Sequence, residues 1–180
     1  MATLTNENEF QQEMKAGERF AFGANWSRFL RVLDEERIVQ AVDSLKDMLG
    51  VDDLMGKTFL DIGSGSGLFS LAARRLGARV VSFDYDPQSV ACTAELKRRY
   101  FDNDADWQVQ QGSVLDLDYV RNLGRFDITY SWGVLHHTGN MWQALGNAGE
   151  TVGEHGKLFI ALYNFQPFLS KYWTVVKRTY

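Results

Sequence analysis

A dense run of glycines lies in the stretch Leu60–Ser70 (LDIGSGSGLFS), directly behind an apolar segment. Gly63, Gly65 and Gly67 occupy alternate positions there, and Asp61 stands just ahead of them. Glycines this close together in a strand-to-helix turn are typical of a backbone that lies against a ligand. Because ligands of open parallel sheets bind beyond the carboxyl ends of the strands, we expect this loop to line a binding site.

The spacing within the loop separates different kinds of ligand. A phosphate-binding P-loop needs a lysine and then a serine or threonine after its last glycine, but Leu68 and Phe69 hold those positions. The dinucleotide fingerprint needs a glycine at the sixth position counted from Gly63, and that position is Leu68. The carboxylate of Asp61 suits a cationic ligand better than a pyrophosphate.

A second acid, Asp84, closes the next predicted strand in the stretch VVSFDYDP. It follows the glycines by about twenty residues, a distance at which an acid accepts hydrogen bonds from ribose hydroxyls. The two acids together favour a nucleoside that carries a cationic, amino-acid-like group in place of phosphates. S-adenosylmethionine is a ligand of this kind.

The residues from about Lys57 to Asn164 resemble those of the class I S-adenosylmethionine-dependent methyltransferases. The acid-x-Gly-x-Gly-x-Gly motif is complete, and FDITYSWGVLHHTGN resembles the family's fourth motif in the subgroup with a Val-Leu-His-His ending. The stretch GSVLDLD departs from the family, because Ser113 stands where an aspartate is common beside the adenine amino group. The resemblance implies these cofactor contacts: Asp61, Gly63, Ser64, Gly65, Gly67, Asp84, Tyr85, Ser113, Val114, Ser131 and Trp132.

The elements that must position these residues alternate between strands and helices. Apolar residues at helical spacing first predict one long helix from Ser27 to Gly50. Strands are then expected at KTFLDI, ARVVSFD, ADWQVQQ, FDITYS and GKLFIALYN, with helices over 68–76, 87–101 and 141–152. This alternation predicts an α/β fold, a Rossmann-like, doubly wound, mainly parallel sheet flanked by helices.

The predicted organisation is a single domain, with a lid segment and helix over residues 1–50 and a cofactor-binding core over residues 51–180. The sheet of the family ends in an antiparallel strand pair, whereas this sequence ends at Tyr180, shortly after the fifth strand. We therefore expect the sheet to lack that pair and the chain to be truncated. The alternative is a short natural variant that closes its sheet edge by oligomerising.

Two histidines are candidates for a catalytic role. Methyl transfer from a sulfonium is an in-line displacement that depends mainly on alignment and on the exclusion of water. A hydroxyl acceptor also benefits from a base, and His136 and His137 are the histidines nearest the expected mouth of the site. His137 is favoured because it is nearer the turn at Thr138 and Gly139. The alternative is that both are packed loop residues.

The aromatic stretch RFAFGANWSRF has two interpretations. Methyltransferases of this family often fold such a segment over the cofactor, which would make Phe20, Phe22, Asn25 and Trp26 lid or substrate contacts. Alternatively, these aromatic side chains cap the core beside the first helix.

Composition limits the partners of the protein. The formal net charge of −4 gives no basic footprint for nucleic acid, and no apolar run reaches membrane-spanning length. The single cysteine, Cys92, fits a reducing compartment, and no cluster of cysteine and histidine indicates a metal site. We expect a cytoplasmic protein, and oligomerisation stays open.

The resulting hypothesis is a methyltransferase that modifies a small-molecule or sugar-type acceptor at oxygen. Two alternatives stay open at this point. One is an NAD-dependent oxidoreductase of the same fold, and the other is a non-catalytic module that binds S-adenosylmethionine.

Overall fold

The computed structural model of the chain describes residues 23–163, except for the side chains of residues 23–25 and 27. Its centre is a sheet in which all strand pairs are parallel, in the order β3-β2-β1-β4-β5. The order reverses between β1 and β4, which is where a doubly wound sheet opens a crevice for ligands. The predicted α/β fold is thus confirmed. The strands are β1 (Thr58–Ile62), β2 (Arg79–Asp84), β3 (Trp107–Gln111), β4 (Phe126–Trp132) and β5 (Val152–Ala161).

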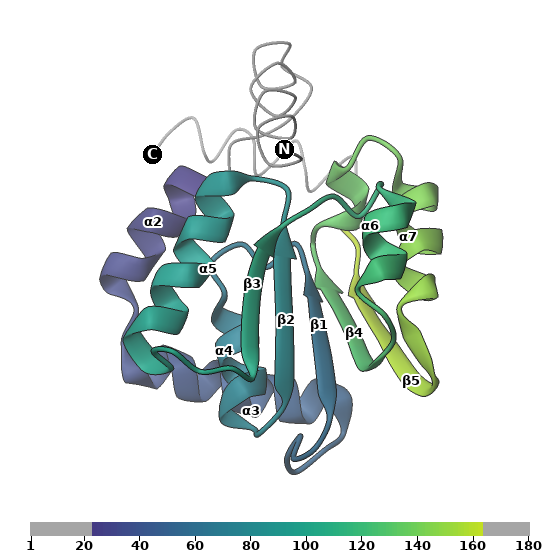
Figure 1. The fold of residues 1–180 in the computed structure, drawn as a ribbon. Helices are drawn as coiled ribbons and strands as arrows, with labels where there is room; N and C mark the ends of the chain where they lie inside the picture. The colour runs from purple at the N-terminus through teal and green to yellow at the C-terminus, as the bar shows by residue number, and fades with distance from the viewer. Residues whose placement is uncertain (1–22, 164–180) are drawn as a thin grey trace, which may run out of the picture.

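Helices cover both faces of the sheet (Figure 1). One face carries α2 (Gly23–Val32), α3 (Glu35–Leu49), α4 (Leu68–Arg75) and α5 (Pro87–Tyr100), and the other carries α6 (Leu117–Asn122) and α7 (Met141–Glu150). Each face has its own cluster of buried apolar side chains. Within residues 23–163, no helix combines the length and the apolar character needed to cross a bilayer.

The N-terminal helical region differs from the prediction of one long helix. Leu33 and Asp34 are not helical and separate α2 from α3. Asp34 has an extended backbone, and its side chain accepts a hydrogen bond from the Arg37 amide at 2.9 Å. Aspartate is a strong N-cap residue because it satisfies an amide that the helix leaves unpaired. The helical spacing of the apolar residues continues on both sides of Asp34, so the sequence pattern did not indicate this helix boundary.

Two other boundaries were placed wrongly, and one helix was missed. The helix predicted over 141–152 ends at Glu150, and β5 begins at Val152 rather than at Gly156. The short helix α6 begins after Asp116, which caps it by accepting from the Tyr119 amide at 3.0 Å. Its six residues are too few to give a clear helical period.

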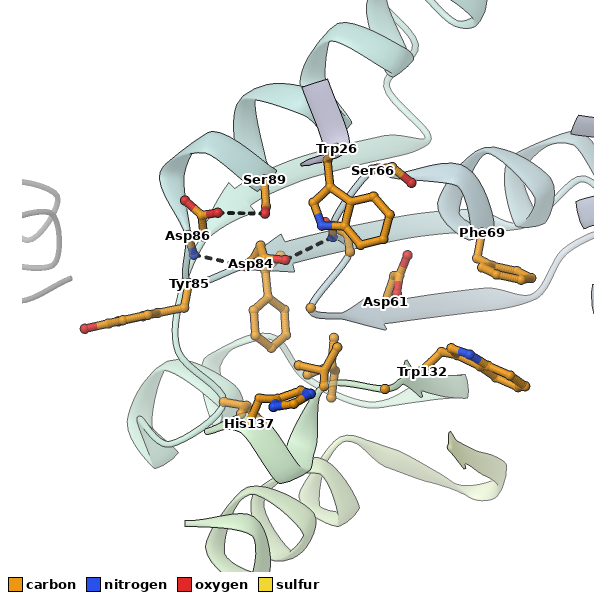
Figure 2. A pocket seen from close by; sticks show the side chains of 18 of the residues that line it. Trp26, Asp61, Ser66, Phe69, Asp84, Tyr85, Asp86, Ser89, Trp132 and His137 are labelled. Atoms are coloured by element: carbon orange, nitrogen blue, oxygen red, sulfur yellow. Dashed lines mark hydrogen bonds between the residues drawn. The ribbon is translucent and has the colours of Figure 1, made fainter. Parts of the chain in front are cut away.

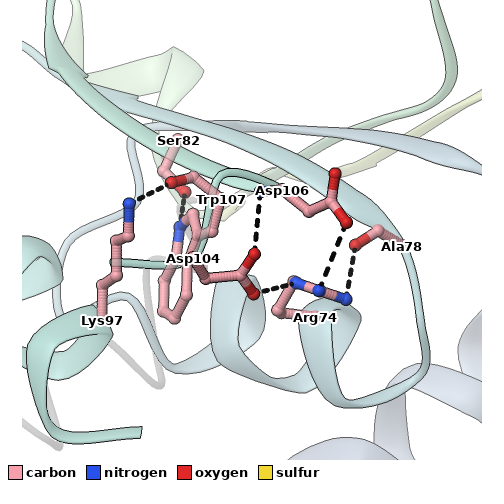
Figure 3. A network of polar contacts seen from close by, with 7 residues as sticks. All are labelled: Arg74, Ala78, Ser82, Lys97, Asp104, Asp106 and Trp107. Atoms are coloured by element: carbon pink, nitrogen blue, oxygen red, sulfur yellow. Dashed lines mark hydrogen bonds and ion pairs between the residues drawn. The ribbon is translucent and has the colours of Figure 1, made fainter. Parts of the chain in front are cut away.

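An ion-pair network ties α4 to the loop before β3 (Figure 3). Arg74 Nε lies 2.7 Å from Asp104 Oδ2, and a second nitrogen of the same guanidinium lies 3.5 Å from Asp106 Oδ2. The hydrogen bond from Arg74 lowers the pKa of Asp104 below its usual value. The network holds the loop that leads into Trp107, a fully buried residue at the start of β3.

Candidate functional site

A cavity of about 540 Å³ opens at the carboxyl ends of β1, β2 and β4. This size lies within the range of small-molecule sites, roughly 300–1,000 Å³. The predicted cofactor contacts that line it are Asp61, Gly63, Ser64, Gly65, Asp84, Tyr85, Ser113, Val114 and Trp132. Gly67 and Ser131 are not among the lining residues.

Asp84 is held at the end of β2 by backbone donors (Figure 2). Its Oδ2 accepts from the Gly65 amide at 2.9 Å, and its Oδ1 accepts from the Asp86 amide at 3.0 Å. Burial raises the pKa of Asp84 to about 6, although these two hydrogen bonds act in the opposite direction. The carboxyl group therefore has a defined orientation, and each oxygen keeps a lone pair for a further donor.

The three glycines of the loop all have positive φ values, +75° at Gly63, +55° at Gly65 and +80° at Gly67. A β-carbon at Gly63 would lie 2.4 Å from a methyl carbon of Val134, and one at Gly67 would lie 3.0 Å from the Cα of Thr93. At these two positions the absence of a side chain therefore leaves room for Val134 and Thr93. Gly63 also lines the cavity, and the predicted cofactor contacts of Gly63 and Gly67 stay predictions.

Gly65 is covered by an aromatic side chain. A β-carbon there would lie 2.9 Å from the indole Nε1 of Trp26, which lines the cavity. The backbone of α2 is tied to α5 by a hydrogen bond from Arg99 to the Leu30 carbonyl at 2.8 Å. Of the other predicted lid residues, Phe20 and Phe22 lie outside the described residues. Asn25 lies in α2, and its side chain is also outside the description.

Asp61 receives a directed chain of hydrogen bonds from the interior. The indole of Trp107 donates to Ser82 Oγ at 2.9 Å, Ser82 donates to Ser70 Oγ at 2.7 Å, and Ser70 donates to Asp61 Oδ2 at 2.5 Å. The direction is imposed by Trp107, because an indole N–H only donates. Burial raises the pKa of Asp61 to about 7, the Ser70 hydrogen bond lowers it, and the nearby charge of Asp84 raises it further.

Phe69 and Trp132 lie on the other side of Asp61 from Asp84 (Figure 2). With Tyr130 and Phe159, whose rings pack against theirs, they form a cluster that we call the aromatic wall. Tyr130 is the register partner of Asp61 on β4. The Tyr130 hydroxyl is buried and has no hydrogen-bond partner among the described residues. The cavity therefore has an acidic end with Asp84 and an aromatic end with Trp132.

The two predicted histidines differ in position. Their rings lie 4.0 Å apart, but only His137 lines the cavity. Both ring nitrogens of His136 are buried without a hydrogen-bond partner among the described residues. Burial first, and then the neighbouring His137, lowers the pKa of His136. His137 is therefore the better placed of the two to meet a ligand.

Two predicted serine contacts use their hydroxyls within the protein. Ser131 is fully buried and donates to the Ile62 carbonyl at 3.0 Å, which ties β4 to β1. Ser113 lines the cavity, and its oxygen accepts from the Leu115 amide at 3.2 Å. An oxygen acceptor can take a second hydrogen bond, so Ser113 can still face a donor in the cavity.

Several residues of the site were missed from the sequence. Ser70, Ser82 and Trp107 come from different elements, and no local pattern joins them. Asp86 caps α5 by accepting from the Gln88 amide at 2.9 Å, and the Asp-Pro pair in DYDP was a usable signal for that cap.

Comparisons with known proteins agree on one family. The methyltransferase domain family matches residues 60–158, more than half of the chain. A ubiquinone biosynthesis O-methyltransferase of Xanthomonas oryzae pv. oryzae is 33% identical over 115 residues, which cover 64% of this chain and 46% of that protein. A ribosomal protein L11 methyltransferase of Alteromonas mediterranea is 54% identical over 48 residues, 26% of this chain and 16% of that protein.

The fold is also found among solved structures. The magnesium protoporphyrin IX methyltransferase of Synechocystis PCC 6803, solved with bound S-adenosylhomocysteine, superposes with a TM-score of 0.62 at 19% identity. The superposition covers 77% of this chain and 61% of that one. The matches to the curated relatives thus span less than half of those proteins' lengths.

Proposed function

Because this chain belongs to the methyltransferase domain family, we propose that it binds S-adenosylmethionine in the cavity and methylates an oxygen of a small-molecule acceptor. The observation that carries the proposal is the charge of the cavity. Asp61 and Asp84 flank the glycine loop, and no lysine or arginine is among the described lining residues. Such a lining suits a cationic nucleoside and offers no cationic side chain to phosphates.

The residues present fit the cofactor at three points. Asp84, oriented by the Gly65 and Asp86 amides, would accept from the ribose hydroxyls. Asp61 would hold the amino-acid end, with one oxygen already engaged by Ser70 and the other open to an ammonium group.

The adenine would lie at the Tyr85 end of the cavity, where Val114 gives an apolar contact and Ser113 an acceptor.

The bound cofactor would supply a methyl group on a positively charged sulfur. Transfer of that methyl group to an acceptor oxygen would leave the electron pair of the carbon–sulfur bond on sulfur, and the acceptor would lose a proton. Trp26 over Gly65 would exclude water, and His137 would take the acceptor proton. His136 does not line the cavity, so the proposal gives it no contact with the acceptor.

The choice of oxygen is supported by the similarity to the ubiquinone biosynthesis O-methyltransferase, although the matched segment covers only part of that protein. The L11 methyltransferase match is much shorter, at 48 residues, and we base no acceptor on it.

Titration calorimetry with S-adenosylhomocysteine and with NAD⁺ tests the proposal. We expect the first to bind and the second not to bind. Asp84→Ala should weaken binding of S-adenosylhomocysteine about tenfold or more, because hydrogen bonds to a charged group contribute about 1.5–3 kcal/mol. Asp118→Ala, an exposed acid on α6, is the matched control. Binding of NAD⁺ alone would point to an oxidoreductase instead.

A second measurement separates an enzyme from a binding module. Release of S-adenosylhomocysteine from S-adenosylmethionine is followed across a panel of hydroxylated small molecules and sugars. Turnover with any of them supports catalysis, whereas tight cofactor binding without turnover on the whole panel favours the non-catalytic alternative.

A further inference from the structure

The aromatic wall forms an ordered array of nearly parallel rings. Tyr130 and Phe159 are cross-strand neighbours with ring centroids 5.6 Å apart and planes inclined by 7°. Trp132 continues the row, 6.1 Å from Phe159 with planes inclined by 9°. Phe69, from α4, packs beside Trp132 at 6.4 Å with planes inclined by 23° and beside Tyr130 at 5.3 Å with planes inclined by 37°. Offset, near-parallel packing of this kind is a favourable arrangement of aromatic rings.

Trp132 is the exposed member of this array that lines the cavity. Tyr130 is buried at 1% exposure, whereas Trp132 is 42% exposed and lines the cavity. A tryptophan of this exposure at the mouth of an apolar cavity is typical of a ligand contact. The row can therefore accept one more flat ring against the indole.

Few polar groups belong to the aromatic wall itself. Phe69, Tyr130 and Trp132 together carry two hydrogen-bonding groups, the Tyr130 hydroxyl and the Trp132 indole N–H. The Tyr130 hydroxyl has no partner among the described residues, but it is buried, which leaves the Trp132 indole as the exposed group of this set. A sugar would bring several hydroxyls to this surface and leave most of them unpaired, at a cost for each.

The charges of the cavity exclude a second class of acceptor. The acids Asp61, Asp84 and Asp86 line it, and the described lining contains neither lysine nor arginine. A phosphate or carboxylate on the acceptor would be repelled by these acids and would meet no lysine or arginine among the described lining residues.

We propose, on the basis of the methyltransferase function above, that the acceptor is a planar aromatic compound without anionic groups and that its ring packs against Trp132. This assigns Trp132 chiefly to the acceptor, whereas the family resemblance implied a cofactor contact for it.

The test compares matched ligands on protein saturated with S-adenosylhomocysteine. The probes are a naphthalenediol, its saturated counterpart decalindiol, a hydroxynaphthoate and glucose. We expect calorimetry to show binding of the naphthalenediol at least about tenfold tighter than that of the other three. With S-adenosylmethionine, the naphthalenediol should also be methylated.

Variants at two tryptophans locate the contact. Trp132→Ala should weaken naphthalenediol binding about tenfold, and Trp132→Phe, which keeps a ring, about threefold or less. Trp142→Ala is the matched control, because Trp142 is 75% exposed on α7 and does not line the cavity. Trp142→Ala should change the affinity neither for the naphthalenediol nor for S-adenosylhomocysteine.

The outcomes are distinguishable. If Trp132→Ala weakens S-adenosylhomocysteine as much as the naphthalenediol, Trp132 belongs to the cofactor site and the proposal is overturned. Equal binding of glucose, decalindiol or the hydroxynaphthoate overturns it as well, as does a naphthalenediol that fails to bind the loaded protein. Failure of S-adenosylhomocysteine to bind the unmodified protein would instead overturn the methyltransferase function itself.

Discussion

At the scale of single residues, burial makes the charged forms of Asp61 and Asp84 unfavourable. Both are carboxyl groups whose pKa is raised mainly by burial, to about 7 and about 6 from the usual 3.8. A raised pKa means that the folded state binds the proton more tightly than the unfolded chain does. These groups therefore stabilise the fold at low pH, and this stabilisation is lost as the pH rises through their folded pKa values.

This linkage predicts a pH-dependent effect of Asp61→Asn on the ligand-free protein. The amide has no charge to bury, and its oxygen can still accept from Ser70. Relative to the unmodified protein, we expect the free energy of unfolding of the variant to rise on the order of 2 kcal/mol between pH 5 and pH 7. Above pH 7 this difference should stay constant. Thermal unfolding at several pH values measures the gap, which is the difference in the free energy of unfolding between the two proteins. A gap that does not change with pH would show that Asp61 titrates normally.

At the scale of elements, the hydrogen-bond chain joins β3, β2 and α4 to Asp61 on β1. In Ser70→Ala, the Asp61 carboxylate loses a donor, so its pKa should rise by about one unit. Calorimetry with S-adenosylmethionine should then show the half-maximal affinity at a correspondingly higher pH, because the cation binds the charged carboxylate.

Ser89→Ala provides the control for that prediction. Ser89 is also buried and donates to a carboxylate, that of Asp86, at 3.0 Å. It should leave the pH midpoint where it is. Identical midpoints for Ser70→Ala and the unmodified protein would mean that the chain does not tune Asp61.

The packing of α4 against α5 depends on Gly67. Alanine there has both an unfavourable φ of +80° and a contact 3.0 Å from the Thr93 backbone, whereas Gly124, at φ +85°, has open space around its β position. Both substitutions incur the backbone cost, but only Gly67→Ala adds a steric overlap of about 1–3 kcal/mol. Urea unfolding of the two variants should differ by this amount. Equal losses would mean that α5 moves aside at no cost.

At the scale of the whole molecule, the position of Trp26 makes α2 part of the site. The sequence analysis predicted a lid in this region, and the indole over Gly65 is consistent with that role. We expect S-adenosylhomocysteine to slow amide hydrogen exchange several-fold in residues 26–32, while exchange in α6 stays unchanged. Mass spectrometry of the two peptides measures this. Unchanged exchange in residues 26–32 at saturating ligand would argue that α2 is only a core helix.

Much of this protein follows from its local sequence. The apolar runs predicted all five strands, and the resemblance to class I methyltransferases, based on the acid-glycine motif, Asp84 and the segment after β4, is confirmed at the level of family and fold. These features were readable because a strand, a turn and a motif are set by neighbouring residues.

The tertiary structure decided what surrounds the motif. It placed Trp26 over Gly65, directed a hydrogen-bond chain from Trp107 to Asp61, and turned the Ser131 hydroxyl inward. It also aligned the rings of the aromatic wall from β4, β5 and α4. Each of these contacts joins residues far apart in the chain, so it depends on strand register and helix docking, which no local pattern specifies.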